Sequence, residues 1–382
     1  MENLLKLSED KKTLLGIQKA TQHIKIPDYI NTIKELAFKC NDSRSIYIPS
    51  SVTTIEKCAF CRCSSLQKIS ISKSNPNYIS IKGVLYNKQQ NTIIKFPSNK
   101  KISEFKIPNS VTTIGHGAFC GCKYLQSIYI PSTVTIIGNN SFSGCESLQN
   151  IEISNSVTTI GHGAFSGCKS LQHIDIPNSI TFIGNNAFSR CSSLQSIKIP
   201  NSVTTIKGKT FFLCFSLQSI EIPNSVTTIE DDVFKTCFSL QSIDVSKENS
   251  SYASLNGVLY DKELKTIIKF PIKKNINEYK IPNSVLTIGN KAFNGCKYLQ
   301  NIEIPNNVIN IGDEAFIGSK VLQGIYLRIT NIENVNISES AFNGIDTNNC
   351  ILYIPPGTRW AYRHHPVFDK FKNIEIEKQE KH

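Results

Sequence analysis

The sequence is poor in the features that mark membrane proteins and long helices. Its 382 residues contain one Met and one Trp, and charged residues make up only 19 % of the chain. No apolar run approaches the roughly 18–20 residues of a membrane span, and no lipidation motif ends the chain. The opening, MENLLKLSEDKKTLLGIQKA, breaks its apolar residues with charges and so lacks the core of a secretory signal. Taken alone, these absences favour a soluble, cytoplasmic product.

Recognisable catalytic and cofactor motifs are also absent. No P-loop, dinucleotide-binding glycine motif or HExxH occurs. His116 and His162 lie in the same GHGAF context and therefore mark related repeats, not a unique site. A Cys–His nucleophile needs one thiol singled out by its surroundings, whereas most cysteines here share one spacing. We expect no enzyme activity, no cofactor and no metal site, although Cys61/Cys63 and Cys120/Cys122 weakly resemble metal-ligand spacing.

The positive charge is concentrated in two short segments. The net charge is +12, from 42 basic and 30 acidic residues. Residues 82–106 hold six Lys against one Glu, and residues 256–280 hold six Lys against three acids. A nucleic-acid-binding protein more often spreads basic residues along one continuous groove. We therefore expect no nucleic-acid partner.

What the sequence has in abundance is a repeat of 23 residues, marked by an Ile that is usually followed by Pro or Ser. The markers are Ile26, Ile48, Ile71, Ile107, Ile130, Ile153, Ile176, Ile199, Ile222, Val245, Ile281, Ile304, Leu327 and Ile354. A period of 20–29 with an L-x-x-L-x-L core is typical of leucine-rich repeats. The sequence thus predicts an α/β leucine-rich-repeat solenoid, β-dominated, with a parallel β-sheet of about fourteen rungs, short helical turns and two β-hairpin insertions.

Each repeat predicts a short strand that buries alternate residues. In LQHIDIP, Ile174 and Ile176 are two apart, so both should point inward from a strand. Pro177 then ends the strand, because it lacks a ladder donor. One unit cannot bury its apolar face alone, but stacked copies can.

The rest of the unit returns the chain to the core. Val157 and Ile160, in SVTTI, form a second apolar pair. Ala164 and Phe165 follow and should close the far side of the core from one turn of helix. These positions repeat in nearly every unit, which indicates that they pack and do not bind.

Cysteine follows the same period. Nine cysteines lie eight residues before a marker, and Ser319 takes that place once: Cys40, Cys63, Cys122, Cys145, Cys168, Cys191, Cys214, Cys237 and Cys296. Cys behaves as a small buried apolar residue, so this pattern predicts a buried, reduced ladder. Stacked strands place successive Cα atoms ~4.8 Å apart, so distance alone does not exclude disulfides. Cys58, Cys61, Cys120 and Cys350 fall outside the ladder.

The period breaks twice in the same way. Near residues 72–106 and 246–280 the step between markers is 36 residues, and in each segment GVLY and TIIKF flank a short polar turn. This pattern predicts β-hairpins that project beside the solenoid. We expect residues 1–25 to form an N-terminal cap from a shortened hairpin unit, residues 26–350 to hold the repeats, and residues 351–382 to form a C-terminal cap.

The C-terminal segment differs from every repeat. It reads YIPPGTRWAY and then FDKFKNIEI, which predicts a strand, a helix carrying Trp360 and Tyr362, and a last strand at Ile374–Ile376. Repeat solenoids need such terminal units to cover the core. We expect Trp360 to pack into this cap.

One position varies inside the otherwise constant unit, directly before each marker. We call these residues the stripe: Tyr47, Lys106, Tyr129, Glu152, Asp175, Lys198, Glu221, Asp244, Lys280, Glu303 and Tyr326. A position free to vary is not critical for packing, so it should face solvent. Repeat surfaces commonly bind extended partners, which makes the stripe either the partner-binding surface or a merely solvated face. A parallel row of glutamines, such as Gln149 and Gln172, is expected to form stacked amide bonds.

The repeat resembles that of BspA-like leucine-rich repeat proteins, which share the unit I-P-x-S-V-T-x-I-G-x-x-A-F-x-x-C-x-x-L-x-x-I found at residues 107–128. The hairpins and the PPGTRWAY end also resemble that family. The resemblance implies a non-catalytic surface antigen or adhesin, secreted or at the cell surface, that binds a protein or glycan of the host matrix or cell surface. The alternative is an intracellular scaffold for protein–protein interaction, which the absence of a signal peptide favours.

Overall fold

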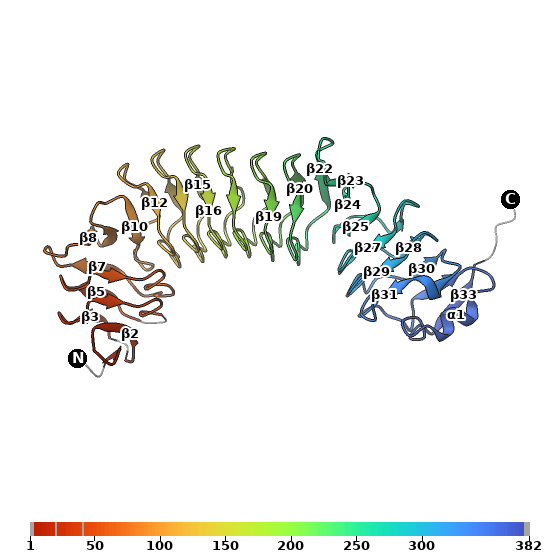
Figure 1. The fold of residues 1–382 in the computed structure, drawn as a ribbon, viewed down its shortest axis with the longest axis horizontal. Coiled ribbons are helices and arrows are strands. Elements are labelled where there is room, and N and C mark those ends of the chain that lie inside the picture. Colours follow the sequence, from red (N-terminus) through yellow and green to blue (C-terminus); the bar gives the residue numbers. More distant parts are fainter. Residues whose placement is uncertain (1–3, 20, 40–41, 378–382) are drawn as a thin grey trace. The chain divides into compact units, whose positions relative to one another are not determined.

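The structure is a computed structural model that describes residues 4–19, 21–39 and 42–377. It shows a leucine-rich-repeat β-solenoid of about 16 turns with almost no helix, which confirms the predicted fold class (Figure 1). The chain divides into two compact units, Met1–Leu217 with Thr228–Cys237, and Gln218–Thr227 with Phe238–His382. We describe each unit by itself.

The turn count exceeds the predicted fourteen because both ends of the chain also stack. Strand β2 (Thr13–Ile17) pairs in parallel with β4 (Thr32–Ile33). At the other end, β33 (Asn373–Ile376) pairs in parallel with β32 (Ile351–Ile354). The prediction counted only the markers from Ile26 to Ile354 and so left these turns out.

Most turns contribute to two ladders of parallel strands. The strands that lead into the marker Ile form the long-strand ladder. In the first unit they are β3 (His23–Lys25), β5 (Ser45–Ile48), β7 (Lys68–Ile71), β11 (Glu104–Lys106), β13 (Ser127–Tyr129), β15 (Asn150–Glu152) and β18 (Ser196–Lys198). In the second they are β20 (Ser219–Ile222), β22 (Ser242–Val245), β26 (Glu278–Lys280), β28 (Asn301–Ile304), β30 (Gly324–Leu327), β32 and β33.

The two-residue strands from the VTTI segments form the short-strand ladder. In the first unit they are β4, β6 (Thr54–Ile55), β12 (Thr113–Ile114), β14 (Ile136–Ile137), β16 (Thr159–Ile160), β17 (Phe182–Ile183), β19 (Thr205–Ile206) and β21 (Thr228–Ile229). In the second they are β27 (Thr287–Ile288), β29 (Asn310–Ile311) and β31 (Asn336–Ile337). The 3-10 turn η2 (Ile332–Asn334) directly precedes β31.

Identical positions pair across neighbouring turns, as a repeat of fixed length requires. Ile128 lies opposite Ile151 in the long-strand ladder, and both are buried. Ile137 lies opposite Ile160 in the short-strand ladder, where both are fully buried. Burying one such side chain contributes about 1.5–3 kcal/mol relative to leaving it exposed. The repeated Ile positions therefore supply the core of every turn.

The long-strand ladder is interrupted at one turn. Residues 171–176 form no strand, although Ile174 is buried. The turn keeps its place through the short-strand ladder, where Thr159 lies opposite Phe182. We expected Ile130, Ile153 and Ile176 to stack in adjacent strands, but β13 and β15 end one residue before Ile130 and Ile153, and no strand forms at Ile176.

The segment after the short strand is a series of tight turns and not the expected turn of helix. Ala164 and Ser166 donate backbone hydrogen bonds three residues back, to Gly161 and Gly163. Between them, Gly163 donates to the next turn of the solenoid, as does Phe165, whose N–H bonds Ala187. A helix would direct every amide to its own segment. Here alternate amides join neighbouring turns, which requires the positive φ of Gly163, +60°.

These tight turns carry a stack of buried aromatic rings. Neighbouring Phe rings lie 5.0–6.2 Å apart and nearly parallel in pairs such as Phe142/Phe165 and Phe211/Phe234. Phe to Ala at such a fully buried position costs about 3–5 kcal/mol. The repeat of AF in the sequence is thus a packing signal, as predicted.

The periodic cysteines are buried beside this stack, as predicted, and they also donate hydrogen bonds. Each thiol from Cys145 onward to Cys237 lies 3.1–3.3 Å from the carbonyl oxygen of a Phe 26 residues earlier. Ser319 makes the same bond to Phe293 O at 2.6 Å. A small side chain with one donor therefore suits this position, which explains why Ser replaces Cys once. The cysteines that the structure describes are free, and Cys40 lies outside the described residues.

The hairpin segments are part of the solenoid and do not project from it. Their strands are β8 (Tyr78–Ile81), β9 (Val84–Asn87) and β10 (Thr92–Lys95), then β23 (Tyr252–Leu255), β24 (Val258–Asp261) and β25 (Thr266–Lys269). In each copy the three strands are antiparallel, and the last pairs in parallel with the short-strand ladder. Val84, Leu85 and Tyr86 are at most 3 % exposed. Projection fails as a prediction because GVLY is an apolar run that supplies core. A shorter antiparallel pair, β1 (Leu5–Leu7) with β2, occurs at the start.

The C-terminal segment forms the predicted helix, α1 (Arg359–His364), and the predicted last strand. Trp360, however, is 68 % exposed and stacks only on His364. Tyr362 fills the core instead, and its hydroxyl donates to Ile329 O at 2.9 Å. The expectation for Trp360 is wrong because a six-residue helix turns only one face toward the core. Tyr362, two residues further along the helix, lies on that face, and Trp360 does not.

Candidate functional site

The stripe lies on the outward face of the long-strand ladder. Its side chains alternate with the buried Ile positions, so they point away from the core. Neighbouring turns hold them in one register: Lys106 lies opposite Tyr129, and Tyr129 opposite Glu152. Nine of the eleven side chains are exposed, and only Glu303 and Tyr326 are half-buried. The expected exposure is therefore present at nine of the eleven positions, and use of the stripe in binding stays a prediction.

In the first unit the stripe is an open row of charged and aromatic side chains. The Lys106 ammonium lies 5.0 Å from the centre of the Tyr129 ring, and Lys25 lies 6.0 Å from that of Tyr47. Asp175 accepts a hydrogen bond from His173 at 2.9 Å. A shallow pocket of about 320 Å³ lies beside Tyr129 and Glu152 and continues over the following turn. These side chains are available to a partner without rearrangement of the core.

In the second unit, stripe residues Lys280, Glu303 and Tyr326 make ion pairs or ring contacts with other side chains of the protein. Glu303 pairs with Lys280 at 2.9 Å and with Arg328 at 3.0 Å. Burial raises and these two cations lower the pKa of Glu303, and the net direction is downward. Tyr326 stacks on Tyr353, with ring centres 4.4 Å apart. A pocket of about 380 Å³ lies over this network.

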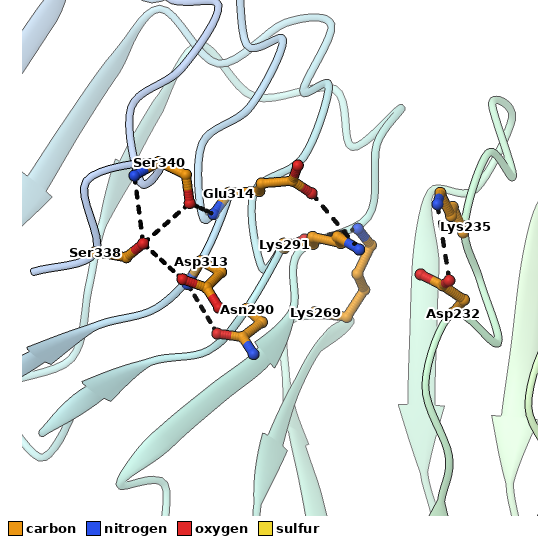
Figure 2. Close-up of polar contacts among 9 residues, drawn as sticks. All are labelled: Asp232, Lys235, Lys269, Asn290, Lys291, Asp313, Glu314, Ser338 and Ser340. Atoms are coloured by element: carbon orange, nitrogen blue, oxygen red, sulfur yellow. Dashed lines mark hydrogen bonds and ion pairs between the residues drawn. The ribbon is translucent and has the colours of Figure 1, made fainter.

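The short-strand side of the second unit carries a different polar network (Figure 2). Asn290 Oδ1 accepts from the Asp313 backbone N–H at 2.8 Å, and Ser338 donates to the Asp313 carboxylate at 2.6 Å. Lys291 pairs with Glu314 at 3.5 Å. These contacts join successive turns of the solenoid, so they stabilise the stack.

The glutamine row is exposed beside the stripe, but its members are joined by their backbones. Gln149 N–H donates to Gln126 O at 2.9 Å, and Gln323 N–H donates to Gln300 O at 2.7 Å. Among the residues that the structure describes, these glutamines make no side-chain hydrogen bond to one another. Stacking of the glutamine side-chain amides therefore stays a prediction, and the observed bonds of this row run through the backbone.

Many lysines of the hairpin segments bond backbone carbonyls. Lys88 and Lys262, at matching positions, donate to Asn75 O and Asn249 O. Lys100 and Lys274 likewise donate to the carbonyls of residues 82 and 256. These contacts hold the chain reversals together, so the local excess of Lys serves the fold and does not by itself mark a site for a polyanion.

Sequence reasoning missed a cluster around a buried lysine in the first unit. Lys95 is 1 % exposed and lies beside Cys61 and Cys120, two of the cysteines outside the ladder. A cavity of about 260 Å³ is lined by Lys95, Cys58, Cys61 and other residues. The only sequence signal was that these cysteines break the period, because a buried lysine cannot be told from a surface one in TIIKF.

The described residues offer little else that resembles a catalytic or metal centre. Within them, no group of three His, Cys, Asp or Glu side chains converges as ligands for a metal ion. His162 Nδ1 accepts from the Asn185 backbone N–H at 2.9 Å, and His364 stacks on Trp360, so each is used locally. None of the helices in the described ranges has the length and hydropathy needed to cross a membrane.

Comparison with known proteins gives one clear family match. The model of the BspA type leucine-rich repeat region matches residues 16–100, 94–214, 158–271 and 269–358, in six copies. A leucine-rich repeat protein from Bacteroides ovatus is 24 % identical and covers 98 % of both chains, with a TM-score of 0.54. A leucine-rich cell surface protein from Faecalibacterium prausnitzii is 24 % identical and covers 98 % of this chain and 93 % of its own, with a TM-score of 0.51. These structures share the fold. No curated protein gives a significant match.

Proposed function

The chain belongs to the BspA-type leucine-rich repeat family, and we propose that it is a binding protein whose protein or glycan partner docks on the stripe. The observation that carries this proposal is the combination of constant packing and variable exposed side chains. Most turns repeat the same Ile, Phe and Cys packing positions, whereas the stripe changes from Tyr to Lys, Glu or Asp. Repeat proteins commonly bind extended partners through such a surface.

The chemistry of the stripe favours a partner with both polar and apolar groups. Exposed Tyr129 and Tyr47 offer large rigid contact areas, which are enriched among interface hot spots. The charged members of the stripe are three Lys and five acids, so it is not a basic surface. Binding should therefore survive moderate salt better than a contact driven by phosphates, and salt should slow association more than it weakens affinity.

Two locations for this activity follow from different observations. The Faecalibacterium structure is described as a cell surface protein, which supports a secreted or surface-exposed adhesin or antigen. The free cysteines that the structure describes instead support an intracellular interaction scaffold, because thiols persist in reducing compartments. Labelling intact cells with an impermeant reagent separates the two: labelling supports the adhesin, and protection supports the scaffold.

The stripe is tested by two matched variants of the same turns. One replaces the stripe residues Tyr129, Glu152, Asp175 and Lys198 by Ala. The control replaces exposed residues on the short-strand side of the same turns, Thr112, Thr135, Thr158 and Thr181, by Ala. Binding to an immobilised matrix protein and to epithelial cells should fall at least about tenfold for the stripe variant, the loss of one hot spot of about 1.4 kcal/mol, and stay unchanged for the control.

The opposite result would place the partner elsewhere. Normal binding by the stripe variant with loss in the control would assign the short-strand side. A third variant neutralises Lys101 and Lys273 in the hairpin segments and leaves out Lys95, because Lys95 is buried. If only this variant loses binding and polyanions compete fully, the hairpins and not the stripe hold the partner.

A further inference from the structure

Three cysteines outside the ladder meet at one point of the first unit. A Cβ atom added at Gly117 would lie 2.5 Å from the Cys61 sulfur and 3.3 Å from the Cys58 sulfur. The Cβ atom of Cys120 lies 3.8 Å from the same point. Gly117, with a φ of +64°, leaves the space that these sulfurs occupy. The three side chains therefore form a cluster and are not isolated thiols.

The cluster surrounds a buried cation that has no carboxylate partner. The Lys95 ammonium donates to Gly117 O at 3.2 Å and to Cys120 O at 2.9 Å. Within the described residues, no Asp or Glu forms an ion pair with it. The ionisable groups that act on it are cysteines, among them Cys120 and Cys61. A buried charge without a counter-ion is strongly unfavourable, so a thiolate is the anion that this site calls for.

Cys120 is the thiol best placed to be that anion. Cys61 is buried, whereas Cys120 is half-buried and in reach of solvent. The hydrogen bond from Cys61 and the charge of Lys95 outweigh burial and lower the pKa of Cys120 to about 6. The two hydrogen bonds and burial raise the pKa of Cys61. The pair thus combines a half-buried thiolate with a protonated neighbour.

The cluster also lies beside open space. The cavity of about 260 Å³ is lined by Cys58, Cys61, Lys95 and His116 and is partly open to solvent. Charged and titratable groups around the cluster are Glu35, Glu56, Lys57, Arg62, Lys95 and His116. The cavity opens on Cys58 and Cys61, and the half-buried Cys120 lies beside them outside its lining. A small molecule can therefore reach the edge of the cluster without unfolding the turn.

The chain itself shows that these thiols are not needed to build the turn. Positions 174 residues later have the same place in the repeat, and there Cys58, Cys61, Gly117 and Cys120 become Asp232, Lys235, Lys291 and Asn294. The matching ladder cysteines, Cys63 and Cys237, are kept. The fold accepts charged and amide side chains where the first copy has thiols, so packing does not account for the cluster.

We propose that Cys120 and Cys61 form a thiol–disulfide exchange site that reacts with small-molecule disulfides. The Cys120 thiolate attacks one sulfur of the small disulfide, forms a mixed disulfide and releases one thiolate, which takes a proton from water. Cys61 then loses its proton to solvent, attacks the Cys120 sulfur and releases the second small thiol. The two protein thiols lose two electrons, and the small disulfide gains them. The attacking thiol has the ionisation that such exchange requires.

The first test measures where the native full-length protein reacts. Limiting bis(2-hydroxyethyl) disulfide is added at pH 6, the reaction is quenched with acid, and the modified cysteines are mapped by mass spectrometry. The proposal expects a Cys61–Cys120 disulfide, with the ladder cysteines unmodified. Modification spread over the ladder, or none before denaturation, would overturn it.

Variants then separate the roles of the residues. Cys61→Ser should trap the mixed disulfide on Cys120, and Cys120→Ser should abolish the reaction. Lys95→Met should slow it about tenfold or more at pH 6, because an ordinary thiol is scarcely ionised there, whereas Lys269→Met at the matching position should not change it. Circular dichroism reports whether each variant folds.

If Lys95→Met folds, equal reaction rates for this variant and the native protein reject the proposal. If it does not fold, the pH dependence of the alkylation rate of Cys120 in the unmodified sequence decides instead. A midpoint near pH 6 supports the proposal, and a midpoint near that of an ordinary thiol rejects it.

Discussion

Two segments with nearly the same sequence, 72–106 and 246–280, hold matching lysines in different surroundings. Both read TIIKF, and both form the same three antiparallel strands. Lys95 is 1 % exposed and lies among cysteines. Lys269 is half-buried and donates to Lys291 O at 3.0 Å, and Lys291 in turn pairs with Glu314 (Figure 2).

The difference arises outside the hairpin strands, in the residues that surround each lysine. Gly117 leaves room above Lys95, and Lys291 has a side chain at the same position. In the first copy the adjoining side chains are thiols, whereas Asp232 and Lys235 at the matching positions form an ion pair at 3.7 Å. Local sequence therefore sets the backbone, and residues more than twenty positions away set the chemistry of the lysine.

The strongest test of this comparison reverses the charge of each lysine. Lys95→Glu places a carboxylate against two carbonyl oxygens in a buried site, so we expect a loss of about 3–5 kcal/mol in the free energy of unfolding. Lys269→Glu, at a half-buried site, should cost clearly less. Urea denaturation of both variants measures the difference, and equal losses would mean that the two sites are not as different as their burial indicates.

The next test fills the space at Gly117. An added Cβ would meet the Cys61 sulfur at 2.5 Å, and the positive φ of +64° disfavours a side chain. We expect Gly117→Ala to cost about 2 kcal/mol, from backbone strain together with displacement of the sulfur. Lys291→Ala keeps a Cβ at a φ of +56° and should be nearly neutral. Thermal melting distinguishes the two variants. An unchanged melting temperature for Gly117→Ala would show that the cysteine side chains move aside at little cost.

Much of the fold was predictable because a fixed period fixes which positions stack. The marker Ile residues, the Phe stack and the Cys ladder all follow from identical residues meeting their own copies one turn later. The exposure of the stripe follows as well, because successive residues of a strand point to opposite faces and the neighbouring Ile is buried. These features require no knowledge of contacts between different positions.

The features that prediction missed depend on contacts that the period does not contain. Helical turns were expected at AF, but alternate amides bond the next turn. The hairpins were expected to project, but Val84–Tyr86 replace core that the missing turn would have supplied. Trp360 and Lys95 were placed by residue type, and each lies in a non-repeating environment where residue type is a poor guide.

A smaller effect concerns pH, since only the first copy carries a low-pKa thiol. The pKa of Cys120 is lowered to about 6, so its thiolate contributes stability that is present above the pKa of an unfolded thiol. This contribution is lost as the pH falls through about 6. The melting temperature of the native protein should therefore rise between pH 6 and pH 9 relative to Cys120→Ser. Asn294→Ser, the matched control, should leave the pH profile unchanged. Parallel profiles for Cys120→Ser and the native protein would contradict a thiolate at this position.

The smallest effect is one in which the two copies should agree. Lys88 and Lys262 both donate to the carbonyl oxygen of a buried Asn, Asn75 or Asn249, whose side-chain amide bonds two carbonyls of the preceding turn. Both exposed ammonium groups donate to this carbonyl, and Lys262 also donates to Lys247 O at 3.2 Å. Lys88→Met and Lys262→Met should each cost about 1 kcal/mol through the shared bond. Because the junctions are built from the same atoms, urea midpoints of the two variants should shift together. A shift confined to one variant would mean that the copies differ in their backbones as well, and that the contrast between Lys95 and Lys269 does not arise from neighbouring turns alone.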